Sequence, residues 1–182
     1  MHTPVGPSPS ESPERPLAGS PTSVDILFAP VLQVVSTMRR FVLALYERIL
    51  QDPDASAEIA LATHELLENA VKYNTHTGTR LRVSVLRQDG PDPGHLVTIR
   101  TANRASLAHI HSAERLVGRV RDAQDPDLMY QQMIRSSLEQ NEGSGLGLAR
   151  IRAETQMSID MTVTGDEIEV TARTLVRPGA AP

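Results

Sequence analysis

The sequence predicts an α+β fold, a two-layer sandwich in which helices cover one face of a mixed, mostly antiparallel sheet. Two observations support this prediction. Apolar residues recur at three- and four-residue spacing in two consecutive segments, as in amphipathic helices, whereas later segments alternate apolar and polar residues, as in half-buried strands. Helices and strands form separate runs instead of alternating one by one, so a doubly wound nucleotide-binding fold is not expected.

The first two helices are expected at residues 31–49 and 53–73. In the first of them, apolar side chains fall on one face and most charged side chains on the other. Asp52 ends this helix and can cap the next one, and Pro53 suits the first helical position because its missing N–H would have no partner there. Turn-forming residues after Tyr73 end the second helix.

Most of the remaining elements are expected to be strands. The predicted strands are residues 24–28, 80–87, 95–101, 158–164 and 167–175. Runs rich in turn-forming residues join the second strand to the third and the fourth to the fifth, as in β-hairpins. A further helix is expected to begin within residues 143–155, and the mixed segment 103–142 contains two shorter helical patches.

Length and composition indicate one ordinary domain, expected over residues 24–176. Of the 182 residues, 40% are hydrophobic, which is enough to build a core, but only 3% are aromatic, so aliphatic side chains must fill it. Residues 1–23 are dense in proline, serine and glycine and have almost no large apolar side chains, so we expect them to be disordered. Residues 177–182 are similar and are expected to form a flexible tail.

Charge and residue usage exclude several function classes. The formal net charge of −4 argues against nucleic acid as a partner, because neutralising phosphates needs clustered basic residues. The chain has no cysteine, which excludes disulfides and cysteine-bound zinc. No apolar run approaches the roughly 20 residues of a membrane helix, and the N-terminal residues lack the layout of a signal peptide. We therefore expect a cytoplasmic protein without membrane contact.

The second helix carries the first group of candidate site residues. Glu65, Asn69 and Lys72 stand at positions i, i+4 and i+7, which share one helix face. A carboxylate can orient or deprotonate an attacking hydroxyl, an amide oxygen is a hard ligand that suits Mg²⁺, and an ammonium group attracts phosphate. The three together suit a metal-bound polyphosphate. A solvated polar face of the helix explains the same spacing.

A glycine-rich turn forms the second group, in the sequence Gly143-Ser144-Gly145-Leu146-Gly147. Glycines allow backbone amides to approach a ligand closely, and the start of a helix favours anions. The turn lacks the Lys-Ser/Thr ending of the phosphate loop and does not follow a strand, as the dinucleotide fingerprint requires. On its own it is equally typical of a tight entry into a helix.

With both groups in this order, the chain resembles the gyrase/Hsp90/histidine-kinase/MutL (GHKL) ATPase superfamily. The superfamily motif E-x-x-x-N-A-x-K matches residues 65–72, and G-x-G-L-G-L matches residues 143–148. The resemblance covers residues 29–176. It implies a Bergerat-type ATP-binding fold, with ATP and Mg²⁺ as cofactors.

The resemblance also implies a role for each residue. Glu65 would be the general base or the acid that orients a water molecule, Asn69 would bind Mg²⁺, and Lys72 would lie near the phosphates. Backbone amides of the glycine-rich turn would bind phosphate. The residues that would supply these amides are Gly143, Ser144, Gly145, Leu146 and Gly147. Residues 103–142 would form a lid over the nucleotide.

One motif of the superfamily, D-x-G-x-G, is degenerate here. Its aspartate recognises adenine, and that position falls on or near Ala102; the first glycine falls on or near Arg104. Asn103 is the candidate that would still form a hydrogen bond to adenine, and an arginine side chain at position 104 could also fill the pocket. Losing one buried hydrogen bond would cost about 1–3 kcal/mol, or roughly one to two decades of affinity for ATP.

The length of the chain narrows the expected function. The first helix has no phosphoacceptor histidine, and there is no room for the transducer domain of the larger members. The chain therefore resembles stand-alone bacterial members, anti-sigma factors with serine-kinase activity and SiaB-like regulators. That resemblance implies partner switching in signal transduction, with a STAS-type antagonist or a sigma factor as the protein partner.

Two hypotheses remain open at this point. The chain is either an ATP-dependent protein serine/threonine kinase, or a nucleotide-independent pseudo-kinase that serves as a protein-binding module. The intact residues Glu65, Asn69 and Lys72 favour the first hypothesis, and the degenerate stretch 102–106 favours the second. A homodimer through the helix at residues 31–49 is a further hypothesis about partners, although a core role explains that helix equally well.

Overall fold

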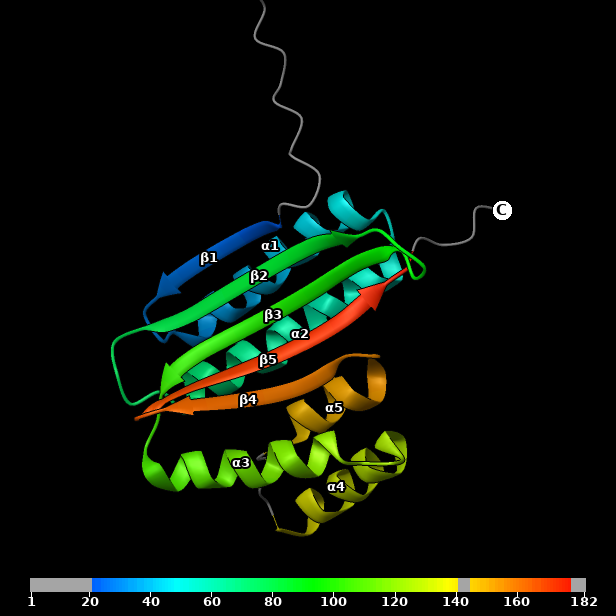
Figure 1. Cartoon of the computed structure of the whole chain (residues 1–182). Coiled ribbons are helices and arrows are strands. Elements are labelled where there is room, and N and C mark those ends of the chain that lie inside the picture. Colours follow the sequence, from blue (N-terminus) through cyan, green and yellow to red (C-terminus); the bar gives the residue numbers. More distant parts are fainter. Residues whose placement is uncertain (1–20, 141–144, 178–182) are drawn as a thin grey trace, which may run out of the picture.

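The computed structural model describes residues 21–140 and 145–177 (Figure 1). In this part of the chain the elements follow in the order β1 (Thr22–Phe28), α1 (Leu32–Leu50), α2 (Pro53–Lys72), β2 (Thr79–Gln88), β3 (Gly94–Arg104), α3 (Leu107–Arg121), α4 (Pro126–Gln140), α5 (Leu146–Glu154), β4 (Ser158–Thr164) and β5 (Glu167–Val176). Every helix and strand predicted from the sequence is present, with ends that differ by a few residues.

The strands form one sheet in the order β1-β2-β3-β5-β4, and each neighbouring pair is antiparallel. The sheet was expected to be mixed, but no parallel pair occurs among the described strands. β5 lies between β3 and β4, because the last hairpin joins the sheet through its second strand. The C-terminal hairpin is thereby attached to the centre of the sheet.

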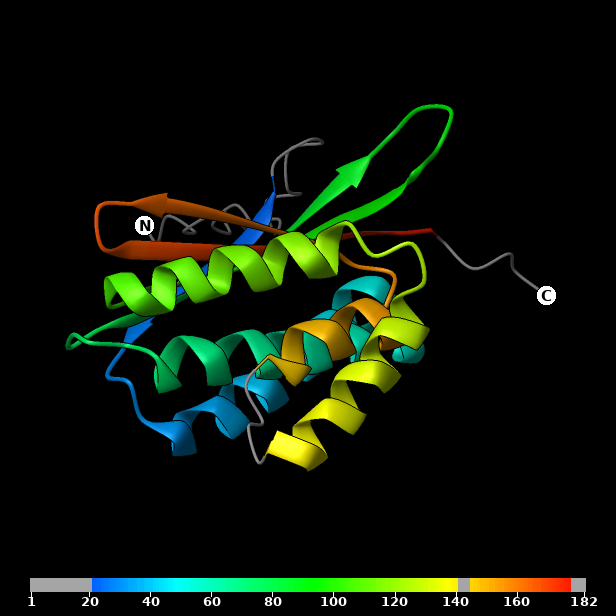
Figure 2. The same cartoon turned by 90° about the horizontal axis from the view of Figure 1, so that it is seen from below.

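All described helices lie on the same side of the sheet, as Figure 2 shows when the molecule is seen from below. Helices α1 and α2 pack against each other, α5 packs beside α2, and α3 follows the β4 edge. Between the layers lies a core of aliphatic side chains that includes Leu66 of α2, Leu81 of β2 and Ile99 of β3. The predicted two-layer sandwich is confirmed.

Local contacts explain where the helices begin. The Asp52 side chain accepts a hydrogen bond from the backbone N–H of Ala55 at 3.0 Å, and Pro53 occupies the start of α2, as predicted. Ser106 caps α3 in the same way, with its Oγ accepting from the backbone N–H of His109 at 3.4 Å. Gln51 connects α1 and α2 in the left-handed conformation, with φ of 55°.

Strand β3 runs on to Arg104, beyond the predicted end at residue 101, and this extension matters for the site. The remainder of the predicted lid folds as α3 and α4, and its action as a lid stays a prediction. Strand β1 begins at Thr22, within the segment expected to be disordered. Residues 1–20 and 178–182, which make up most of the two predicted flexible ends, lie outside the described residues. Among the described helices, none is long and apolar enough to cross a membrane.

Candidate functional site

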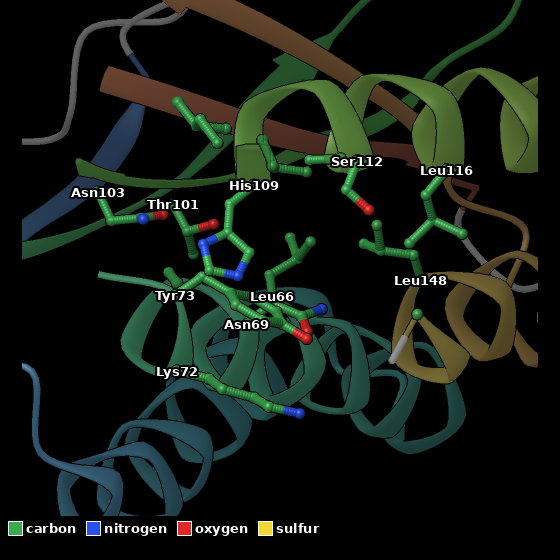
Figure 3. A pocket seen from close by; sticks show the side chains of 15 residues that line it. Leu66, Asn69, Lys72, Tyr73, Thr101, Asn103, His109, Ser112, Leu116 and Leu148 are labelled. Atoms are coloured by element: carbon green, nitrogen blue, oxygen red, sulfur yellow. The ribbon is translucent and has the colours of Figure 1, made fainter. Parts of the chain in front are cut away.

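A cavity of about 500 Å³ lies between α2, α3 and the inner face of β3 and β5, with the start of α5 at one end (Figure 3). Its volume lies within the range of small-molecule sites. Its wall is mostly apolar, with a limited set of polar groups. These polar residues are Asn69, Lys72, Tyr73, Thr101, Asn103, His109 and Ser112.

Helix α2 contributes two of the three residues predicted from its polar face. Asn69 and Lys72 line the cavity, together with Leu66 one turn before. Lys72 is exposed, and its ammonium group lies 5.3 Å from the centre of the Tyr73 ring. An exposed cation and an amide among the lining residues suit a polyanion that carries a metal ion. The described residues contain no cluster of three or more histidine, aspartate and glutamate side chains that could hold a metal on its own.

Glu65, the third predicted residue on this face, is not among the residues of the cavity wall. Its Oε1 lies 3.2 Å from Nη1 of Arg150, on α5, and its side chain is only 14% exposed. The Nε of Arg150 also donates to both carboxylate oxygens of Glu154 at 3.0 Å. The hydrogen bond to Glu154 raises the pKa of Arg150, and the negative charges of Glu154 and Glu65 raise it further. Desolvation of the guanidinium opposes part of this shift. The role of Glu65 as a general base stays a prediction.

The glycine-rich turn reaches the cavity through Gly145, which lies directly before α5 and has φ of 96°. The backbone conformation of Gly145 favours glycine, and a Cβ atom there would lie 2.7 Å from Cδ2 of Leu116, so the Leu116 side chain would have to move. Leu146 and Gly147 follow on α5 and do not line the wall. Gly143 and Ser144 lie outside the described residues, so their predicted contact with phosphate is not described.

The register of β3 corrects the prediction for the adenine end of the site. Side chains alternate between the two faces of a strand, and Thr101 and Asn103 are the ones that line the cavity. Ala102 and Arg104 are absent from the wall. The exposed guanidinium of Arg104 lies 3.7 Å from Asp166 (Nε to Oδ1), so Arg104 does not fill the pocket, although the sequence had allowed this.

Thr101 was missed by the sequence analysis, although the alternation that identifies it was visible. Its side chain continues the buried series of Val97 and Ile99, and the residue is only 2% exposed. Asn103 is 8% exposed, and its Nδ2 donates to the carbonyl oxygen of Arg104 at 3.2 Å. The predicted contact of Asn103 with adenine is not tested, but its position at the wall is compatible with it.

Helix α3, which lies within the predicted lid, supplies a third wall whose residues the sequence analysis did not single out. His109, Ser112 and Leu116 line the cavity at three- and four-residue spacing. The Nδ1 atom of His109 lies 2.9 Å from Oγ of Ser106, and its ring centre lies 4.8 Å from that of Tyr73. The ring pair joins α3 to the end of α2. In Figure 3, Thr101, Asn103 and His109 lie toward one end of the cavity, and Leu116 and Leu148 lie toward the other.

The fold is similar to that of a chain in the crystal structure of the SiaB-SiaC complex from Pseudomonas aeruginosa. The TM-score is 0.54, the sequences are 12% identical, and the match covers 84% of this chain and 89% of the other. At this identity the likeness concerns the fold alone. No family model matches the sequence, and no curated protein matches it. The likeness agrees with the expected SiaB-like fold.

Proposed function

We propose that the chain is a signalling regulator that binds Mg-ATP in the cavity between α2, α3 and the sheet, and that it phosphorylates a protein partner on serine or threonine. One observation carries the proposal. Asn69 and Lys72 of α2 and Gly145 at the start of α5 are far apart in the sequence and line the same cavity. These are residues of the two motifs that resemble the GHKL ATPases, and their convergence supports a common ligand.

Each of these residues has a chemical task in the proposed complex. The Asn69 oxygen would bind Mg²⁺, which keeps several water ligands and takes further oxygens from the phosphates. Lys72 would offset the negative charge of the phosphates. The first N–H groups of a helix have no partner within the helix, so those that follow Gly145 would serve the phosphates.

The opposite end of the cavity offers hydrogen-bonding groups for a base. Thr101 supplies a hydroxyl, which can donate and accept, and Asn103 supplies an amide, which can do both as well. Apolar side chains of β5, Ile168 and Val170, form part of the same wall. A flat, partly apolar ring with polar edges is the kind of group that such a wall accommodates.

Phosphoryl transfer would need a group that accepts the proton of the substrate hydroxyl. The GHKL resemblance assigns this task to Glu65, but its carboxylate is paired with Arg150 in this structure. The choice of a STAS-type antagonist or a sigma factor as the protein partner rests on the resemblance, and the similar solved structure is itself a complex of two proteins, SiaB and SiaC. A homodimer through α1 stays a prediction.

A second candidate function is a nucleotide-independent protein-binding module. Two observations favour it. Among the described residues of the cavity wall there is no carboxylate that could recognise the adenine amino group, and Glu65 already has a partner in Arg150. In such a module the cavity would be a remnant of the fold, and partner binding would not depend on nucleotide.

Isothermal titration calorimetry of the full chain with Mg-ATP separates the two candidates. Micromolar binding that the substitution Asn69→Ala weakens would support the proposed nucleotide site. Arg104→Ala is the matched control, because Arg104 lies outside the cavity wall. The affinity of this variant for Mg-ATP should equal that of the wild type. No binding up to millimolar Mg-ATP by a folded protein would reject the kinase and leave the binding module. Transfer of labelled phosphate to a panel of STAS-type domains then tests the substrate class.

A further inference from the structure

Glu65 and Arg150 form a bridge between α2 and α5, directly beside the cavity. The bridge joins Oε1 of Glu65 to Nη1 of Arg150 at 3.2 Å. Arg150 is held from its other side by two hydrogen bonds from Nε to the carboxylate of Glu154. The guanidinium therefore links the last turn of α5 to the middle of α2.

The Glu65 carboxylate also lies against the first turn of α5. A Cβ atom placed on Gly147 would collide with Oε2 of Glu65, so a larger residue at this position would displace the carboxylate. Two residues earlier, Gly145 is in similarly close contact with Leu116 of α3. The beginning of α5 is thus held by α2 at Gly147 and by α3 at Gly145.

We propose that Glu65 and Arg150 are a positioning pair that fixes the first turn of α5, so that its backbone N–H groups face the phosphates of a nucleotide in the cavity. The inference rests on the proposed function, because it concerns the phosphates of the same ligand. Donors that are fixed before the ligand arrives bind it more tightly, because no ordering is needed at that moment. Glu65 then acts through α5 and does not need to touch the ligand.

A positioning role and a general-base role for Glu65 lead to different expectations. A base that acts only on the substrate hydroxyl affects turnover, so Glu65→Gln would leave the affinity for Mg-ATP unchanged. A positioning pair affects the affinity for Mg-ATP, and substitution of either partner removes the same contact. Glu65→Gln and Arg150→Gln should then weaken Mg-ATP binding by similar factors, and the double variant should be no weaker than the single ones.

Calorimetry on the full chain tests the pair, with Mg-ATP and adenosine as the two probes. We expect Glu65→Gln and Arg150→Gln each to raise the Kd for Mg-ATP about tenfold, as the loss of a supporting partner typically does. Adenosine, which has no phosphate, should bind these variants and the wild type alike. Arg150→Lys keeps the positive charge and should retain part of the affinity that Arg150→Gln loses.

The matched control is Glu68→Gln, because Glu68 is a half-exposed carboxylate on the same helix and is paired with His64 (Oε2 to Nε2, 3.5 Å) and not with Arg150. Its affinity for Mg-ATP should stay within about twofold of the wild type. Thermal unfolding of each variant shows whether it is folded, and Glu65→Gln carries the test if Arg150→Gln does not fold. Wild-type binding with an unchanged Kd for Glu65→Gln or Arg150→Gln would overturn this inference alone. Absence of binding by the wild type would overturn the proposed function, and this inference with it.

Discussion

Thr101 and Arg104 belong to the same strand, β3, but only Thr101 lines the cavity, whereas Arg104 pairs with Asp166 outside its wall. The two residues are three positions apart, so the period of two along a strand directs them to opposite faces of the sheet. The base end of the proposed site is therefore open and carries a buried hydroxyl. An arginine does not block it.

The first prediction concerns the hydroxyl group of Thr101. Thr101→Val keeps the shape of the side chain and removes the hydroxyl, so the affinity for Mg-ATP should fall about tenfold if this group hydrogen-bonds the base. Thr98→Val is the matched control, because Thr98 lies on the opposite face of the same strand and outside the wall. Calorimetry of the two variants measures the difference. Equal affinity for both would show that Thr101 does not contact the base.

The second prediction concerns the entry to α5. Gly145→Ala introduces a Cβ atom 2.7 Å from Cδ2 of Leu116 and strains a backbone with φ of 96°, so the free energy of unfolding should fall by about 1–3 kcal/mol. Chemical denaturation measures the change. Gly165→Ala is the control, because Gly165 has φ of 64° and open space around its Cα; it should lose only the roughly 1 kcal/mol of backbone strain.

The steric part of this prediction has its own test. In the background Leu116→Ala, the clash with residue 145 is removed, so Gly145→Ala should then cost about as much as the control at Gly165. An unchanged cost in both backgrounds would show that the clash plays no role. The loss would then come from the backbone conformation alone.

The elements and layers of the fold could be predicted because they depend on local patterns. Asp52 and Pro53 identify the boundary between α1 and α2 through capping chemistry, which involves neighbours in the sequence only. The alternation in β2 and β3 identifies the buried face of the sheet. The position of β5 between β3 and β4 was not predicted, because strand order depends on pairings between distant segments.

The candidate site could be predicted only for residues whose placement depends on a single helix or strand. Glu65, Asn69 and Lys72 share a helix face, but Arg150 of α5 pairs with Glu65, and this carboxylate does not line the cavity wall. The wall formed by α3, with His109 among its residues, required knowledge of how α3 lies against the sheet. Helical periodicity identifies which residues share a face, and packing decides what that face meets.

The third prediction concerns the cap of α2. Asp52→Ala removes the oxygen that accepts from the N–H of Ala55, so the protein should lose about 1 kcal/mol of unfolding free energy. Asp52→Asn keeps an accepting oxygen and should lose much less. Urea denaturation of the two variants measures the difference. If both lose the same amount, the negative charge near the helix start, and not the cap, is the stabilising feature.

The fourth prediction concerns Tyr46 of α1, whose hydroxyl is buried without a hydrogen-bond partner in the described part of the chain. Burial raises the pKa of Tyr46 well above its usual value of about 10. Tyr46→Phe removes a hydroxyl group that loses its hydration on folding and gains no hydrogen bond in return. At neutral pH the variant should therefore be as stable as the wild type or more stable by about 1 kcal/mol.

The raised pKa of Tyr46 also gives the variant a distinct pH dependence. Above pH of about 10 the unfolded chain loses the Tyr46 proton while the folded chain keeps it, so this residue lowers wild-type stability as the pH rises further. Below that pH the Tyr46 hydroxyl is protonated in both states and the residue adds no pH dependence. The stability advantage of Tyr46→Phe should therefore be constant from pH 7 to about 9 and grow above about 10. Denaturation curves at these pH values measure it, and an advantage that shrinks at high pH would mean that the hydroxyl is ionised within the folded protein.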